Sequence, residues 1–109
     1  MFTVIDTLEE FYQATKHPAV LFYFSHENCN VCKTLKPKVE EFISQNFPEV
    51  KLYYVDTVKS PDIAGQNRVF TNPVVLIYLD GRESHRFSRY FSLQNLYEAL
   101  AKPYEIIFS

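Results

Sequence analysis

The chain has 109 residues, 47% of them hydrophobic, and a formal net charge of −2. This length and apolar content suffice for a buried core, so intrinsic disorder is excluded and one domain over residues 1–109 is expected. The near-neutral charge gives no reason to expect nucleic acid or an anionic membrane as a partner. The longest apolar run, 19–24, is too short to span a bilayer.

The N-terminus and the cysteine content both bear on the cellular compartment. Residues 1–6 lack a basic segment followed by an apolar stretch, so no signal peptide is expected and the sequence predicts a cytoplasmic protein. The two cysteines of the chain are Cys29 and Cys32. In a reducing compartment, a CxxC pair is more often catalytic or metal-binding than a structural disulfide.

The first half of the chain is expected to alternate strands with helices. The expected elements are a short strand at 3–5, a helix from Thr7 to about Lys16, a buried strand at 19–24 and a helix from Cys29 to about Phe47. Thr7 and Glu10 form a capping box at the start of the first helix. The apolar side chains expected to face the core from that helix are Leu8, Phe11 and Tyr12. Pro37 falls inside the second helix, which it is expected to kink.

The second half is expected to add three strands and two helices. These are a strand at 51–55, a short helix from Pro61 to about Gly65, a buried strand at 74–79, an antiparallel strand at 82–87 and a last helix after Ser92. Asp80-Gly81 is a strong hairpin signal. Ser60 and Ser92 are expected to cap the two helices. The apolar tail at 103–108 is expected to pack back on the domain.

The CxxC pair is placed where a helix follows a buried strand. Cys29 is then the exposed thiol at the positive end of the helix dipole, which favours the nucleophilic thiolate. Cys32, one turn further, is the shielded thiol that resolves a mixed disulfide. The positive charges of Lys33 and Lys36, and of His26 when protonated, favour the thiolate further.

A second feature lies directly before the strand at 74–79. Asn72-Pro73 is a candidate for a cis peptide bond, which is usually a structural feature where it occurs. Such a bond would expose the backbone groups of Asn72 beside Cys29. An extended substrate would then bind there as a short added β-strand.

Taken together, these features resemble the thioredoxin family over about residues 3–101. The features that carry the resemblance are the strand–CxxC–helix unit, Pro37 five residues after the second cysteine, the strand at 52–56, Pro73 before a strand, the Asp80-Gly81 hairpin and the last helix. The resemblance implies an α/β thioredoxin fold, with a central mixed β-sheet of four to five strands flanked by helices. It also implies a redox-active Cys29–Cys32 pair and a cis Pro73 beside it.

Several positions depart from the family pattern. Asn28 stands where the family has tryptophan, and Asn30-Val31 where it has Gly-Pro. Tyr23 stands where the family has a buried acid that helps to deprotonate the resolving cysteine, and Leu52 where it has the lysine that partners this acid.

A glycine that shapes the substrate groove of the family is also missing, and Tyr90 or Phe91 is expected in its place. From these departures we expect a redox-active pair that is slower or more selective than a general thioredoxin.

The residues around the pair allow simpler or different interpretations. His26-x-x-Cys29-x-x-Cys32 offers three metal ligands at usable spacing, and an iron–sulfur cluster shared across a dimer is a related possibility. His26 is otherwise an exposed loop histidine. Glu27 is either a surrogate proton acceptor or a solvated loop acid. Tyr23 is either a core aromatic with a bonded hydroxyl or a modulator of Cys32.

The sequence therefore predicts a cytoplasmic, thioredoxin-like protein disulfide reductase. Cys29 attacks and Cys32 resolves, while Asn72 and Pro73 position the substrate. No dissociable cofactor and no bound metal are expected. The expected partners are protein disulfide substrates and an upstream thiol or flavoprotein reductase. The alternatives are a thioredoxin-fold binding module for one specific partner, or a metal or iron–sulfur carrier.

Overall fold

The computed structural model describes all 109 residues and contains five strands and four helices. In chain order these are β1 (Thr3–Val4), α1 (Leu8–Ala14), β2 (Ala19–Ser25), α2 (Asn30–Asn46), β3 (Lys51–Asp56), α3 (Pro61–Gln66), β4 (Val74–Leu79), β5 (Arg82–Ser88) and α4 (Leu93–Ile107). This order agrees with the one expected from hydrophobic periodicity and turn residues.

The five strands form one mixed sheet in the order β1-β3-β2-β4-β5. β3 runs parallel to both β1 and β2, whereas β4 runs antiparallel to β2 and to β5. The central strand β2 is buried along its whole length, as its unbroken apolar sequence predicts. Its C-terminal end therefore has a fixed position in the sheet, and the segment that follows starts from there.

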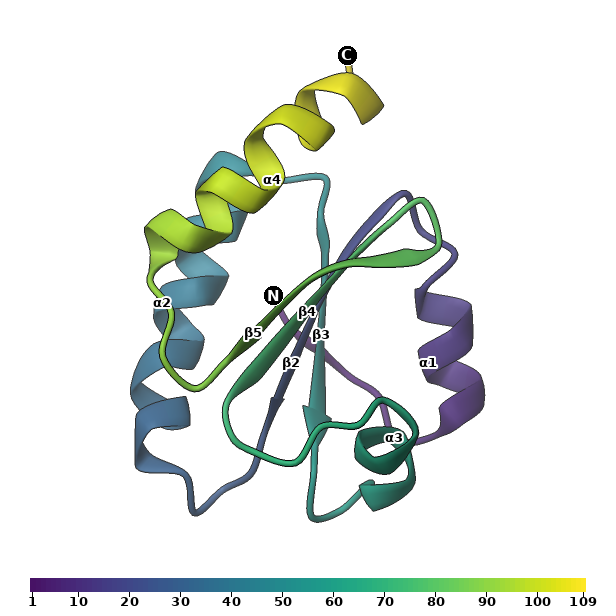
Figure 1. The fold of residues 1–109 in the computed structure, drawn as a ribbon, viewed down its shortest axis with the longest axis vertical. Coiled ribbons are helices and arrows are strands. Elements are labelled where there is room, and N and C mark those ends of the chain that lie inside the picture. Colours follow the sequence, from purple (N-terminus) through teal and green to yellow (C-terminus); the bar gives the residue numbers. More distant parts are fainter.

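Helices cover both faces of the sheet (Figure 1). One apolar cluster joins α2 and α4 to one face and includes Tyr23, Cys32 and Leu96. A second cluster joins α1 and α3 to the other face and includes Phe11 and Ile63. The sheet thus separates two cores, and Cys32 belongs to the core under α2.

Local sequence signals account for several element boundaries. Thr7 and Glu10 form the expected capping box, with the Glu10 N–H donating to Thr7 Oγ1 over 3.1 Å. Asp80 and Gly81 both have positive φ, 53° and 80°, as a tight hairpin turn between antiparallel strands requires. α2 continues through Pro37, whose side chain is exposed. The Asn72–Pro73 bond is cis, as the resemblance implied.

Two expectations differ from the structure in detail. Tyr12 does not face the core, because its side chain lies 48% exposed on the outer side of α1. The Ser60 hydroxyl does not cap α3 but donates to the carbonyl of Asp6 over 3.3 Å. The last helix, for which no end was expected from the sequence, continues through Pro103 to Ile107.

The apolar tail packs back on the molecule as part of α4. The ring of Tyr104 lies 5.1 Å from that of Phe47 and 4.7 Å from that of Phe108. The Tyr104 hydroxyl also accepts a hydrogen bond from the Glu49 N–H over 3.1 Å. Ile106, in contrast, is 77% exposed.

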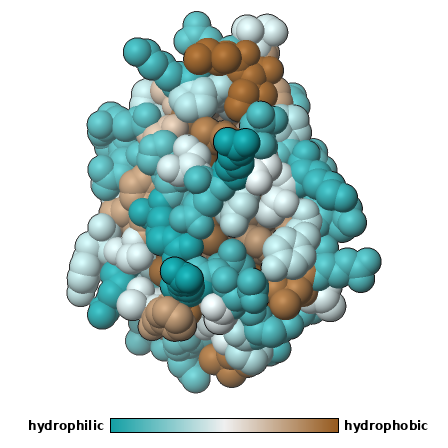
Figure 2. All heavy atoms as spheres, turned by 45° about the vertical axis from the view of Figure 1, so that its right-hand side comes forward, coloured by the Kyte–Doolittle hydropathy of each residue, from teal (hydrophilic) through white to brown (hydrophobic).

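The surface that Figure 2 shows is mainly hydrophilic, with scattered hydrophobic atoms. A group of hydrophobic atoms at the top of this view lies at the height of the C-terminal end of α4 (Figures 1 and 2). None of the helices combines the length and the apolar character needed to cross a bilayer.

Candidate functional site

The two cysteines meet where β2 ends and α2 begins, at the lower end of the sheet in Figure 1. They form a disulfide, with their Cα atoms 5.2 Å apart. Cys29 is the N-cap of α2, and its Sγ accepts a hydrogen bond from the Cys32 N–H over 3.2 Å. Cys29 is half-buried, whereas Cys32 is 1% exposed. Cys29 is therefore the more solvent-accessible residue of the disulfide.

Tyr23 lies beneath Cys32, in the core between the sheet and α2. Its side chain is fully buried, and its hydroxyl donates a hydrogen bond to the Cys32 carbonyl over 3.0 Å. Burial, with a smaller contribution from neighbouring Tyr54, raises the pKa of Tyr23 well above its ordinary value. Tyr23 is consequently a neutral hydrogen-bond donor to the backbone of the redox pair.

Lys36 lies beside Tyr54, the tyrosine whose ring stacks on that of Tyr23. Its ammonium lies 4.1 Å from the ring centroid of Tyr54 and 5.6 Å from that of Phe2. The Tyr54 hydroxyl in turn accepts a hydrogen bond from Ser25 Oγ over 2.9 Å. The rings of Tyr54 and Tyr23 are stacked with their centroids 6.3 Å apart. The positive charge of Lys36 is thus directed over aromatic faces.

The cis Pro73 lies opposite Cys29. Cys29, Asn72 and Pro73 line the same hollow, which has a volume of about 190 Å³. Asn72 is half-buried, and its Oδ1 accepts a hydrogen bond from Thr57 Oγ1 over 3.4 Å. The backbone N–H and C=O of Asn72 make no hydrogen bond within the chain. These two groups are available to an extended peptide.

The segment after β5 completes the wall of this hollow. The Arg89 N–H donates to the Pro73 carbonyl over 2.7 Å, and Arg89 has a φ of 58°. The left-handed backbone that favours glycine therefore falls at Arg89, one residue before the expected Tyr90 or Phe91. The sequence has no glycine at this position, and the bond to Pro73 joins two residues that are far apart in the chain.

A larger groove continues from the hollow along α2. It has a volume of about 590 Å³ and is lined by residues from the first turns of α2 and from the segment 89–91. Asn30, Val31, Arg89 and Tyr90 line both the hollow and the groove. Val31, an apolar residue in the first turn of α2, is 60% exposed here. Cys29 thus opens onto one continuous depression.

The remaining predicted residues, two in the loop between β2 and α2 and one in α2, lie at the edge of the site. His26 Nδ1 accepts a hydrogen bond from the Asn28 N–H over 3.2 Å. Glu27 forms an ion pair with Lys59 over 3.3 Å, in which both side chains are largely exposed. Lys33 is exposed one residue beyond Cys32. None of the three lines the hollow that contains Cys29.

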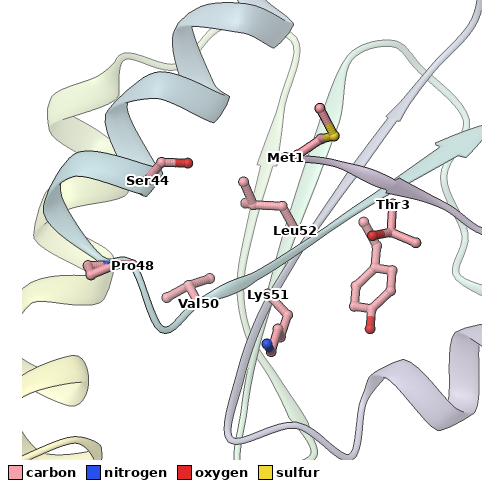
Figure 3. Close-up of a pocket in the computed structure, with 8 residues that line it drawn as sticks. Met1, Thr3, Ser44, Pro48, Val50, Lys51 and Leu52 are labelled. Carbon is pink, nitrogen blue, oxygen red and sulfur yellow. The ribbon is translucent and has the colours of Figure 1, made fainter.

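Another hollow, of about 350 Å³, lies at the opposite end of the sheet (Figure 3). Leu52, Lys51 and Met1 surround it, together with the C-terminal end of α2. β3 starts there and runs parallel to β2, which pairs Val20 with Lys51. This hollow contains no cysteine. No group of three or more His, Cys, Asp or Glu side chains is arranged to hold a metal ion.

Comparison with known proteins agrees with the arrangement of the site. The family model for thioredoxin matches residues 2–102. The thioredoxin-like protein YdfQ of Bacillus subtilis is 31% identical over 91 residues, which cover 84% of this chain and 80% of that protein. The thioredoxin of Acetoanaerobium sticklandii is 31% identical over 100 residues, which cover 91% of this chain and 93% of that protein.

Comparison with solved structures agrees with the comparison of sequences. The crystal structure of mitochondrial thioredoxin 3 from Saccharomyces cerevisiae, in its oxidised form, superposes with a TM-score of 0.83 at 25% identity. The superposition covers 92% of this chain and 93% of the yeast chain. With its thioredoxin fold and its Cys29–Cys32 disulfide, the chain belongs to the thioredoxin family of thiol–disulfide oxidoreductases.

Proposed function

We propose that the chain reduces protein disulfides, with Cys29 as the attacking thiol and Cys32 as the resolving thiol. The observation that carries this assignment is the difference in burial within the disulfide, since Cys29 is half-buried and Cys32 is 1% exposed. The position of Cys29 at the N-cap of α2 supports it, because the helix dipole favours a thiolate there.

The reaction proceeds in two exchanges. The Cys29 thiolate attacks one sulfur of the substrate disulfide, forms a mixed disulfide and releases the other substrate sulfur as a thiolate, which takes up a proton. Cys32 loses its proton and attacks the Cys29 sulfur, which frees the second substrate thiol and closes the Cys29–Cys32 disulfide. Two electrons pass from the protein to the substrate. An upstream thiol or flavoprotein reductase, in the cytoplasm, returns them.

Asn72 and Pro73 position the substrate in this proposal. The free backbone N–H and C=O of Asn72, in the same hollow as Cys29, support the addition of an extended peptide as a short strand. The substrate cysteine is then aligned with the Cys29 sulfur.

Three of the four side chains that were expected to tune the pair keep that role in this proposal. Lys33 supplies a positive charge one residue beyond Cys32. Tyr23 positions Cys32 through its hydrogen bond to the backbone. His26 shapes the loop before Cys29 through its bond to the Asn28 N–H. The ion pair between Glu27 and Lys59 supports a solvated loop acid rather than a proton acceptor.

The proposed reductase is slower or more selective than a general thioredoxin. The reason is that Tyr23 offers Cys32 a neutral hydroxyl, with a raised pKa, where the family pattern has an acid. Insulin reduction tests this. We expect a rate below that of the Acetoanaerobium sticklandii thioredoxin under the same conditions, and an equal rate would contradict the proposal.

Two cysteine variants test the roles of the thiols. Cys32→Ser is expected to accumulate a mixed disulfide with a protein substrate, because no thiol resolves it. Cys29→Ser is the matched control and is expected to accumulate none. Mass spectrometry under non-reducing conditions measures both. The reverse pattern, with trapping through Cys32, would show that the roles are wrongly assigned.

A further inference from the structure

We propose that the groove along α2 selects protein disulfides in which an acidic and an apolar residue lie close to the reacting cysteine. This inference deepens the proposed reductase function and rests on it. The groove joins the hollow that contains Cys29, because Asn30, Val31, Arg89 and Tyr90 line both. A peptide linked to Cys29 therefore extends into the groove.

The lining of the groove combines apolar and cationic side chains. The apolar part consists of Val31, Leu35, Tyr90 and Phe91, of which Val31 is 60% and Tyr90 87% exposed. Lys38 and Arg89 provide two positive charges, and no acidic residue lines the groove. An occupant that matches this lining carries an apolar side chain and a negative charge.

These cations have no acidic partner within the chain. The ion pairs of the molecule are Lys59 with Glu27 and Arg86 with Glu83, and neither involves Lys38 or Arg89. No acidic residue stands in the first turn of α2 or of α4, the helices beside the groove. A negative charge from a substrate can therefore approach two cations that are not engaged in ion pairs within the chain, although the whole chain has a net charge of −2.

The backbone fixes where Arg89 stands. Its N–H is bound to the Pro73 carbonyl, and its guanidinium lies 5.5 Å from the ring centroid of Tyr90. A φ of 58° is less favourable for arginine than the right-handed region, whereas glycine adopts it readily. The Arg89 side chain is therefore held in the groove by a backbone that is bonded to the loop of Pro73.

The experiment compares peptides that differ only in charge. Each peptide has one cysteine, linked by a disulfide to a thiopyridine leaving group, and carries Glu or Gln at one of the positions flanking that cysteine. Attack by Cys29 on the peptide sulfur forms the peptide–Cys29 disulfide and releases the thiopyridine, whose absorbance gives the second-order rate constant. At the best position we expect the Glu peptide to react about fivefold faster at low salt. The ratio should approach one as salt screens the charges.

Variants that reverse one positive charge test whether the groove causes the preference for the Glu peptide. Arg89→Glu and Lys38→Glu are each expected to abolish or invert the ratio of the Glu and Gln peptides. Arg82→Glu is the matched control, because Arg82 lies at the other end of β5, where it is paired with Leu79. It should leave the ratio unchanged.

The outcomes separate this inference from the proposed function. A wild-type ratio near one at every position, or the same ratio in all three variants, overturns the inference alone. If a Cys29→Ser variant reacts as fast as the wild type, the proposed function is wrong and the inference falls with it. If the variants change the sedimentation coefficient and not the ratio, a second copy of the chain covers the groove, and the proposal is wrong.

Discussion

Tyr23 and Leu52 are two departures from the family pattern that fit each other. Both side chains are buried in the core under α2, and the Tyr23 hydroxyl is satisfied by the Cys32 carbonyl. A buried acid at position 23 would need a cation, and Leu52 offers none. The pair therefore keeps this part of the core uncharged, and the Tyr23 hydroxyl is bonded to the Cys32 backbone.

Removal of the Tyr23 hydroxyl tests this interpretation. Tyr23→Phe keeps the ring and loses the 3.0 Å hydrogen bond to the Cys32 carbonyl, so we expect the free energy of unfolding to fall by about 1 kcal/mol. Urea denaturation of the oxidised protein measures the change. Tyr12→Phe is the control, because Tyr12 is 48% exposed and its hydroxyl makes no hydrogen bond in the chain. A loss no larger than that of the control would show that the Tyr23 bond contributes nothing to stability.

Arg89 gives a second prediction for a single residue. Arg89→Gly removes the strain of a φ of 58°, which outweighs the larger conformational entropy of glycine in the unfolded chain. We expect a gain in stability of up to about 1 kcal/mol, measured by urea denaturation. Arg82→Gly, in the regular part of β5, is expected to lose about 0.5–1 kcal/mol. Destabilisation of the Arg89 variant by as much as the Arg82 variant would contradict the strain argument.

At the level of elements, the sequence predicted what depends on neighbours in the chain and missed what depends on distant contacts. The apolar run of β2, the capping box at Thr7 and the Asp80-Gly81 turn each act locally, and each was confirmed. The Ser60 hydroxyl was wrongly assigned as a cap because its partner, Asp6, lies far away in the sequence. The backbone of Arg89 depends in the same way on Pro73.

For the site, too, the sequence predicted the features that depend on neighbouring residues and missed those that depend on distant contacts. The positions of Cys29 and Cys32 follow from a strand that leads into a helix, and a cis Pro73 follows from the family resemblance. The groove beside them was not predicted, because its walls come from α2 and from the distant segment 89–91. The sequence shows Val31 only as an apolar residue near a helix start. The structure shows that it lines the groove.

The last turns of α4 give a prediction for an element. Tyr104 connects them to the rest of the molecule through Phe47 and through the hydrogen bond from the Glu49 N–H. Tyr104→Ala removes both contacts, and we expect the free energy of unfolding to fall by about 2 kcal/mol, in urea denaturation. Ile106→Ala is the control in the same turn, where a 77% exposed side chain should change stability by less than about 0.5 kcal/mol. Equal effects would show that the tail does not contribute to stability.

At the level of the whole molecule, the chain concentrates its reactive features at one end of the sheet. The C-terminal end of β2, the start of α2, the cis Pro73 and the segment after β5 all meet there. Rigid, fully buried β2 supports this end from below, while the two cores on either side of the sheet hold α2 and α3 in place. Chemistry at Cys29 can therefore proceed at a fixed geometry relative to Pro73 and Arg89.

The tyrosines of the core make the stability of the whole molecule sensitive to alkaline pH. Burial raises the pKa of Tyr23, and to a smaller extent those of Tyr53 and Tyr78. In the unfolded chain a tyrosine ionises near pH 10, whereas folded Tyr23 keeps its proton above that pH. The unfolded state then binds fewer protons than the folded state, so stability falls as the pH rises through and beyond about 10. The hydrogen bond and ion pair with Glu27 raise the pKa of Lys59 and act in the same direction.

The Tyr23→Phe substitution should reduce the loss of stability at alkaline pH. For a fully buried tyrosine the free energy of unfolding is expected to fall by up to about 1.4 kcal/mol for each pH unit above 10, and phenylalanine has no proton to lose. Urea denaturation of the oxidised protein at about pH 8, 10 and 10.5 measures both slopes. We expect the wild type to lose stability more steeply than the variant above pH 10 and both to be level below pH 9. Parallel curves would mean that Tyr23 ionises in the folded protein as readily as in the unfolded chain, and its burial beneath Cys32 would then not hold in solution.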